Sequence, residues 1–296
     1  MKVVVTGSSG FIGTALVASL RAGGHEVVRL VRRAPSGADE ARWDPASGTV
    51  EATALDGADA VVNLAGPGIG DKRLTPSYKA EVRNSRIDAT TTIAKAVASH
   101  KDTVKVLVSA SAVGWYGDRG DDVLTESEPA GTDFLAELAR DWEAATSPAT
   151  DAGVRVVMTR TGIVLGRGGG ALGRMLPIFK AGLGGRLGSG RQWVSWISLD
   201  DEVAAIRFAI DHPSLAGPVN LTAPHPVTNR EQTAALARAL HRPAVAAVPR
   251  TALRIALGEF ADLGVLASQR ALPQKLQDAG FAFQHPTIDT ALTAPA

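Results

Sequence analysis

The sequence contains no cysteine, and this absence removes several kinds of chemistry at once. No disulfide can form, no thiolate can act as a nucleophile, and no metal site can use sulfur ligands. The six histidines are scattered without the spacing of a metal-ligating motif, so we expect no metal site. The first residues also lack the pattern of a secretory leader, and the protein is therefore expected to be cytoplasmic.

An excess of one charge and long apolar runs are missing as well. The formal net charge is +1, which provides no overall field to attract nucleic acid or an anionic membrane. No run of about 18 apolar residues occurs, so no membrane-spanning helix is predicted. We expect a small-molecule partner, no nucleic acid and no membrane, and a monomer or a homodimer.

The first 160 residues alternate short apolar runs with helical patterns. The predicted strands are residues 2–6, 26–31, 60–64, 104–109 and 154–161, and the later helices are 76–99 and 133–149. Apolar strands separated by helices indicate a parallel sheet that is covered on both faces. We predict an α/β fold, a Rossmann-type doubly wound parallel sheet in residues 1–165, with a smaller C-terminal α/β substrate-side region in 166–296. Residues 43–54 are predicted to form a hairpin inserted before the third strand.

A glycine-rich turn, GSSGFIG at residues 7–13, follows the first strand and opens a helix. Glycine permits the tight turn and lets backbone N–H groups approach a diphosphate, beside roughly half a positive charge at the helix N-terminus. The alternative is an ordinary strand-to-helix turn. We assign cofactor binding to Gly7, Ser9, Gly10, Phe11, Ile12 and Gly13.

Arg32 and Arg33 follow the second predicted strand, where an NAD site usually carries an acidic residue that holds the ribose hydroxyls. The nearest upstream acid, Glu26, lies at the other end of that strand. A guanidinium can instead bind a 2′-phosphate through charge-assisted hydrogen bonds, each worth about 1.5–3 kcal/mol. The sequence therefore predicts NADP as the cofactor, unless the two arginines are merely solvated surface residues.

Further motifs occur along the chain: VVNLAG at 61–66, VSASAVGWYG at 108–117, RTGIVLG at 160–166 and WISLDDEV at 196–203. Together with the glycine turn they resemble the extended short-chain dehydrogenase/reductases, the NAD(P)-dependent sugar epimerases and dehydratases. Residues 257–292 are similar to the C-terminal module of an epimerase-like subgroup of unassigned substrate. The resemblance implies that Asn63, Leu64 and Ala65 line the adenosine-ribose side of the groove, and that Ser109 and Ser111 border the nicotinamide. For residues 63–66 the alternative is a strand end that turns into a loop.

One part of the family's pattern is missing. The family uses a tyrosine as acid and base, with a lysine four residues later that binds the nicotinamide ribose and lowers the tyrosine pKa. Residues 134–141, where this pair is expected, contain neither residue type, and Tyr78 and Tyr116 are followed four residues later by Val82 and Gly120. Three interpretations remain: Tyr116 donates the proton beside Ser111, the substrate has an acidic proton and needs no such residue, or the chemistry has been lost.

Ser111 and Tyr116 are accordingly the catalytic candidates, against a plain strand-end serine and a tyrosine that stacks in the pocket. Residues 166–191 hold ten glycines and no acidic residue. Their cations, unopposed by carboxylates, could gather around a phosphate or carboxylate. They are Arg167, Arg174, Lys180, Arg186 and Arg191. We expect Arg191 to contact a substrate anion and Trp193 to stack on a ring or cover the pocket, the alternative being a solvated lid with tryptophans in the core.

These features predict an NADP-dependent oxidoreductase or epimerase-like enzyme that acts on a small anionic substrate, such as a nucleotide-sugar or another phosphorylated compound. The competing hypothesis is a catalytically impaired NADP(H)-sensing binding protein, because the Tyr-x-x-x-Lys pair is absent.

Overall fold

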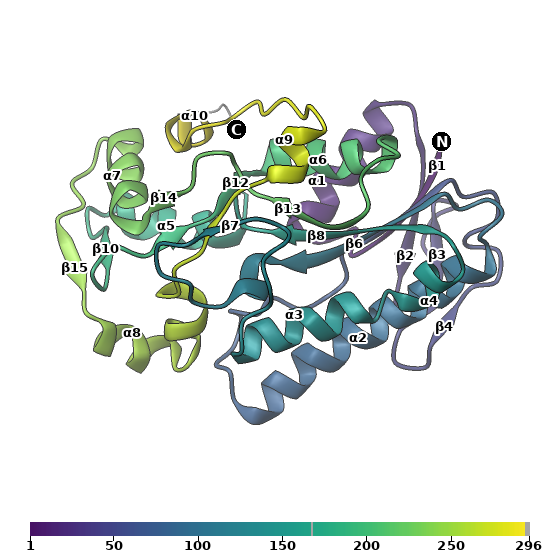
Figure 1. Ribbon diagram of the computed structural model, residues 1–296, viewed down its shortest axis with the longest axis horizontal. Helices are drawn as coiled ribbons and strands as arrows, with labels where there is room; N and C mark the ends of the chain where they lie inside the picture. The colour runs from purple at the N-terminus through teal and green to yellow at the C-terminus, as the bar shows by residue number, and fades with distance from the viewer. Residues whose placement is uncertain (167, 294–296) are drawn as a thin grey trace.

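An eight-stranded sheet forms the centre of the molecule. The computed structural model describes residues 1–166 and 168–293, and its main sheet has the order β13-β8-β6-β5-β1-β2-β3-β4 (Figure 1). The strands are β1 (Lys2–Thr6), β2 (Glu26–Val31), β3 (Glu40–Asp44), β4 (Thr49–Val50), β5 (Ala60–Asn63), β6 (Val106–Ala112), β8 (Arg155–Thr161) and β13 (Gly217–Leu221). All neighbours pair in parallel except β3 and β4. The predicted Rossmann-type fold is confirmed.

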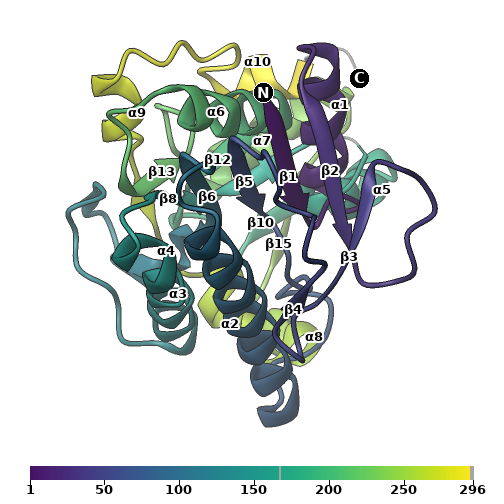
Figure 2. The ribbon, with the colours of Figure 1, turned by 90° about the vertical axis from the view of Figure 1, so that its right-hand side faces the viewer.

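Helices cover both faces of this sheet. One face carries α1 (Phe11–Ala22) and α6 (Leu199–Asp211), and the other carries α2 (Pro76–Ser99), α3 (Phe134–Ala144) and α4 (Ser147–Asp151) (Figures 1 and 2). The single helix predicted over residues 133–149 is thus two helices. Pro148 explains the break, because it has no N–H to donate to the carbonyl of Ala144 and can only start a new helix.

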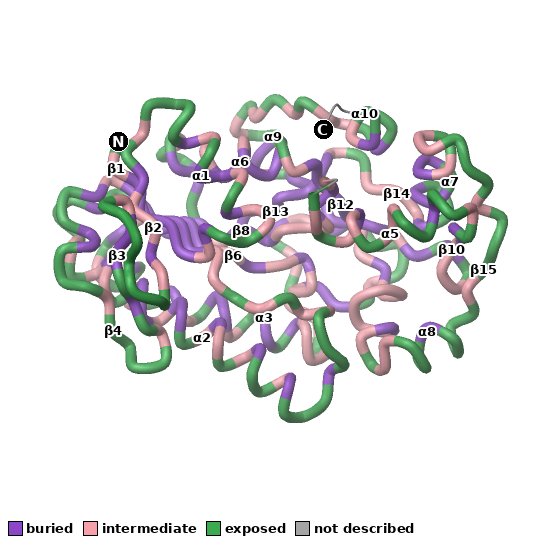
Figure 3. Tube along the Cα trace, turned by 180° about the vertical axis from the view of Figure 1, so that it is seen from behind, coloured by how far each residue is buried: buried purple, intermediate pink, exposed green. Residues whose placement is uncertain are grey.

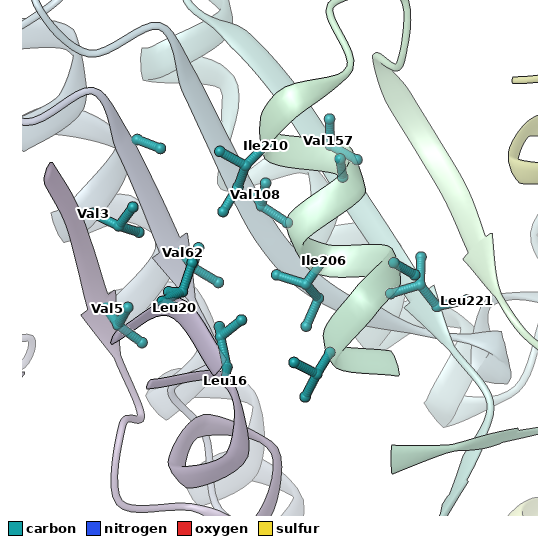
Figure 4. Packing of buried hydrophobic residues seen from close by; sticks show 14 of the residues in the cluster. Val3, Val5, Leu16, Leu20, Val62, Val108, Val157, Ile206, Ile210 and Leu221 are labelled. Carbon is teal, nitrogen blue, oxygen red and sulfur yellow. The ribbon is translucent and has the colours of Figure 1, made fainter. Parts of the chain in front are cut away.

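The core under α1 and α6 shows why these segments fold as they do. Residues four apart on each helix, Leu16 with Leu20 and Ile206 with Ile210, face the sheet (Figure 4). On the strands every second residue points at these helices, as Val3 and Val5 do in β1. Figure 3 shows the buried positions concentrated along the central strands. The packing fixes the start of α1 at the carboxyl end of β1.

The hairpin predicted at residues 43–54, before the third predicted strand, is formed by β3 and β4. Trp43 pairs with Val50 across the β3–β4 turn, and β3 also pairs in parallel with β2 through Arg29 and Glu40. The hairpin therefore extends the sheet at its edge.

The remaining elements lie mostly in a smaller region beyond the carboxyl ends of the strands, apart from α9 (Gln274–Asp278), which packs on β13 with Leu276 in the core under α6. They are a 3₁₀ turn η1 (Val113–Tyr116), β7 (Val123–Leu124), β9 (Ile163–Leu165), α5 (Gly170–Lys180), β10 (Gly185–Leu187), β11 (Trp193–Val194), β12 (Trp196–Ser198), β14 (Val227–Thr228), α7 (Asn229–Leu240), β15 (Ala246–Val248), α8 (Arg250–Leu257), a π-helical turn η2 (Ala261–Val265), β16 (Arg270–Ala271), α9 (Gln274–Asp278) and α10 (Ile288–Thr293). Both α6 and β13 lie after residue 165 yet complete the first region. In the part of the chain that the structure describes, no helix is long and apolar enough to cross a membrane.

Candidate functional site

The glycine turn between β1 and α1 is possible only with glycine at two of its positions. Gly7 has φ +65°, and a Cβ added there would lie 2.5 Å from the carbonyl oxygen of Leu64. A Cβ on Gly13 would lie 2.2 Å from the carbonyl oxygen of Gly7. The N–H of Gly10 closes the turn by donating to Gly7 at 3.0 Å. The first glycine lets β5 approach, and the last lets the helix pack on the strand.

The N-terminus of α1 is open to an anionic ligand. Its N-cap residue, Gly10, provides no side-chain hydrogen bond, and the first turn contains no acidic residue. Unpaired backbone N–H groups and the helix dipole together favour a phosphate at such a position. Ser9 and Gly10 are exposed, and Phe11 and Ile12 are half-buried. The Phe11 ring packs against Gly166 and Gly169, so we expect Phe11 to contact a cofactor through its backbone.

Arg32 and Arg33 turn out to have different surroundings. Arg33 donates from both terminal nitrogens to Glu40, at 2.7 and 2.6 Å, and the Glu40 side chain is buried. These bonds, followed by that of the Ser36 backbone, lower the pKa of Glu40 to about 2. Arg32 is exposed, and no hydrogen bond or ion pair joins its side chain to residues 1–166 or 168–293. Of the two, Arg32 is the one free to hold a phosphate.

Asn63 and Ser109 belong to a buried polar network at the strand ends. Thr6 donates to the Asn63 side chain at 2.7 Å, and Asn63 donates to Thr90 at 3.0 Å and to Ser109 at 3.2 Å. Asn63 is 0% exposed and Ser109 is 1% exposed. These side chains tie β1, β5, β6 and α2 together. The loop that follows, with half-buried Leu64 and Ala65, presents its backbone to the glycine turn instead.

Ser111 is also buried and bonded. Its hydroxyl donates to Glu143 of α3 at 2.7 Å, and Arg160 of β8 donates to the same carboxylate from Nε at 2.8 Å and from a terminal nitrogen at 2.9 Å. Arg160 is 2% exposed. Neither Glu143, the partner of Ser111, nor Arg160, the cation paired with Glu143, was predicted from the sequence. An arginine inside the apolar strand of residues 155–161 was the available signal, because a buried guanidinium requires an acceptor.

Tyr116 lies in the core rather than in an open pocket. Its side chain is 0% exposed, and its hydroxyl lies 2.7 Å from the side-chain oxygen of Asn220 and 3.0 Å from the Thr125 carbonyl. Burial raises the pKa of Tyr116 above its ordinary value, which favours the neutral phenol. The other tyrosine, Tyr78, donates to the carbonyl of Gly68 at 2.6 Å. A catalytic role for Tyr116 stays a prediction, and this conformation gives its hydroxyl a structural one.

The basic segment after residue 165 is partly neutralised, contrary to the expectation that no carboxylate opposes it. Arg174 pairs with Asp71, which comes from the distant loop after β5. Arg186 donates to the backbone of Gly188 and Ser189. Arg167 lies outside the described residues, and Lys180 is exposed.

Of the two residues predicted to contact substrate, Arg191 lies two positions before β11 and Trp193 begins that strand. Arg191 is exposed. Trp193 donates its indole N–H to Asp121 at 2.8 Å, and the guanidinium of Arg270 lies 4.4 Å from its ring centroid. The Trp193 ring therefore already has a cation stacked on it. The contacts of both residues with a substrate stay predictions.

The motifs of this site match known proteins over nearly the whole chain. Residues 3–221 match the NAD dependent epimerase/dehydratase family, and residues 248–294 match a domain of unknown function, DUF1731. The chain is 53% identical, over 98% of its length, to Epimerase family protein Mb2239 of Mycobacterium bovis, of which it covers 96%. The fold is similar to the crystal structure of human epimerase family protein SDR39U1 with NADPH, with a TM-score of 0.91 and 35% identity over 99% of this chain and 98% of that one.

A second solved structure, the nucleoside-diphosphate sugar epimerase from Corynebacterium glutamicum, has a TM-score of 0.80 and 40% identity, covering 99% of this chain and 57% of that chain. The resemblance inferred from the motifs is confirmed.

Proposed function

Because this chain belongs to the NAD dependent epimerase/dehydratase family, we propose that it is an NADP-dependent oxidoreductase or epimerase-like enzyme acting on a small anionic substrate. The observation that carries the proposal is the uncapped start of α1 beside an arginine without a partner, Arg32. The crystal structure of the human relative with NADPH supports the same cofactor. A bound nicotinamide supplies a carbon that donates or accepts hydride.

In this proposal different segments of the chain bind different parts of the cofactor and the substrate. The backbone N–H groups of Ser9 and of residues 11–13 bind the diphosphate, since that of Gly10 already donates to Gly7, and Arg32 binds the 2′-phosphate. The loop after β5 lies along the glycine turn, with Leu64 and Ala65 exposed in part. Ser111, held by Glu143, fixes the end of β6 where the reacting ring would lie. Anionic substrate groups would meet exposed Arg191.

The two arginines after β2 provide a matched test of the cofactor. We expect Arg32→Gln to weaken NADPH binding by about ten- to a hundredfold, because one charge-assisted contact is lost, and to leave NADH binding unchanged. Arg33→Gln should lower the unfolding midpoint by depriving buried Glu40 of a partner, without changing the ratio of the two affinities. Calorimetric titration of both variants with both cofactors measures this. An Arg32 variant with the wild-type preference would contradict the assignment.

One observation favours a second candidate, an NADP(H)-sensing binding protein without turnover. Neither Ser111 nor Tyr116 has a free hydroxyl, since both are buried and bonded. Incubation with NADPH or NADP⁺ and a panel of nucleotide sugars and sugar phosphates, followed by cofactor absorbance and by chromatography of the sugars, separates the two candidates. A sensor binds the cofactor and leaves both cofactor and sugar unchanged, whereas a net absorbance change, or an epimer formed without one, identifies an enzyme.

A further inference from the structure

One arginine of α2 is buried without a counter-charge. Arg86 is 8% exposed, and its guanidinium lies 4.9 Å from the ring centroid of Trp142. It donates to the carbonyl of Pro67 at 2.8 Å and, more weakly, to that of Val82 at 3.3 Å. Its Nε is buried with no acceptor in the described chain. The side chain thus retains a donor that protein groups do not use.

The other arginines nearby show what this one lacks. Buried Arg160 has the carboxylate of Glu143, and Arg83, one turn earlier on α2, pairs with Asp141. No carboxylate among residues 1–166 and 168–293 lies within ion-pairing distance of Arg86. Burial lowers the pKa of Arg86 to about 10, so the group remains charged at neutral pH. An unpaired buried charge is costly unless something else compensates it.

The position of Arg86 relative to the sheet indicates where compensation could come from. The bond between Asn63 and Thr90 marks the level on α2 at which β5 ends. Arg86 precedes Thr90 by four residues, which is about 6 Å along the helix toward its N-terminus and beyond the carboxyl edge of the sheet. Ligands of open α/β sheets bind at that edge.

The loop after β5 connects Arg86 to the glycine turn. A Cβ on Gly66 would lie 3.4 Å from both Cγ and Cζ of Arg86, so the guanidinium lies against that glycine. Two residues earlier in the same loop, Leu64 lies against Gly7. The same short loop therefore contacts both the glycine turn and the buried cation.

We propose that Arg86 supplies the counter-charge for an oxyanion of a ligand that binds at this carboxyl edge of the sheet, either a phosphate of the dinucleotide or a phosphate or carboxylate of the substrate. The inference rests on the proposed function.

The charge can be removed with little change in volume by Arg86→Met, and Arg83→Met is the matched control on the same helix. Unfolding midpoints are measured alone, with NADPH, and with UDP added to the NADPH-saturated protein, and calorimetry gives the NADPH affinity. We expect Arg86→Met to unfold at the wild-type midpoint or above without ligand, because an uncompensated charge is gone. We expect one ligand affinity to fall by about ten- to a hundredfold.

The two probes identify the source of the anion. Weaker NADPH binding assigns it to the cofactor, and wild-type NADPH binding with a lost response to UDP assigns it to the substrate. Arg86→Lys, which keeps the charge, should stay within a few-fold of wild type and serves if Arg86→Met fails to fold. A purely structural role predicts a lower midpoint and unchanged responses to both probes, which would overturn the inference. Failure of the wild type itself to bind NADPH would instead overturn the proposed function.

Discussion

A buried carboxylic acid makes the stability of this protein depend on pH in an unusual direction. Glu202 of α6 is 1% exposed, accepts a hydrogen bond from the Thr161 hydroxyl at 2.9 Å, and has a second oxygen without a partner in the described chain. Burial raises the pKa of Glu202 to about 8. At neutral pH this carboxyl is therefore protonated in the folded state, whereas in the unfolded state it is ionised.

The sign and size of the effect follow from proton linkage. Between about pH 4.5, where the unfolded carboxyl ionises, and about pH 8, the folded state holds one proton more, so the free energy of unfolding falls by about 1.4 kcal/mol per pH unit. Glu202→Gln cannot ionise in either state. The free energy of unfolding of the variant should therefore exceed that of the wild type by about 3 kcal/mol more at pH 7 than at pH 4.5, because only the wild type loses stability through ionisation of residue 202.

Urea unfolding of both proteins at pH 5, 6, 7 and 8 measures the difference. A pH-independent difference in the free energy of unfolding reflects the hydrogen bonding of the glutamine amide. The test is therefore how that difference changes with pH. Glu137→Gln is the control, because Glu137 is exposed and the same substitution there should give parallel curves. Parallel curves for Glu202→Gln as well would refute the reasoning, since they would mean that Glu202 ionises normally in the folded protein.

Two other substitutions test the packing and the ion pair around the site. Gly13→Ala should lower the free energy of unfolding by about 1–3 kcal/mol or more, because its Cβ would lie 2.2 Å from the Gly7 carbonyl oxygen; unchanged urea unfolding would show that the turn can shift. Glu143→Gln should cost about 3–5 kcal/mol in the same assay, because it leaves Arg160 buried without a counter-charge, and a cost below about 1 kcal/mol would mean that the pair contributes little.

The sequence predicted best those parts of the fold that local patterns encode. The helix predicted at residues 76–99 has those bounds, since Thr75 caps it, accepting from the Tyr78 N–H, and Pro76 suits its first position. The glycine turn could be predicted equally well, because the strand, the glycine spacing and the apolar helix are contiguous in the chain. Such signals need no knowledge of what lies across the fold.

The partners of the polar residues could not be predicted in the same way. Ser111 bonds to a residue 32 positions away, and Tyr116 bonds to one 104 positions away, so no local pattern reveals that either hydroxyl is occupied. Arg86 sits in a helix with ordinary polar neighbours, and it is buried by two segments distant in sequence, α3 and the loop after β5. Arg33 is the exception, since Glu40 is seven residues away on the next strand and an ion pair was foreseeable.

The sequence distance between β8 and its neighbour β13 affects how the chain folds. β13 pairs with β8 from Gly217↔Val157 to Leu221↔Thr161. During synthesis the outer edge of β8 therefore stays unpaired until about sixty further residues have been added. A fragment that stops at residue 165 would expose that strand edge and the face that α6 covers, both of which invite self-association. We therefore expect residues 1–165 to fold together with the later segments rather than as an autonomous unit during synthesis.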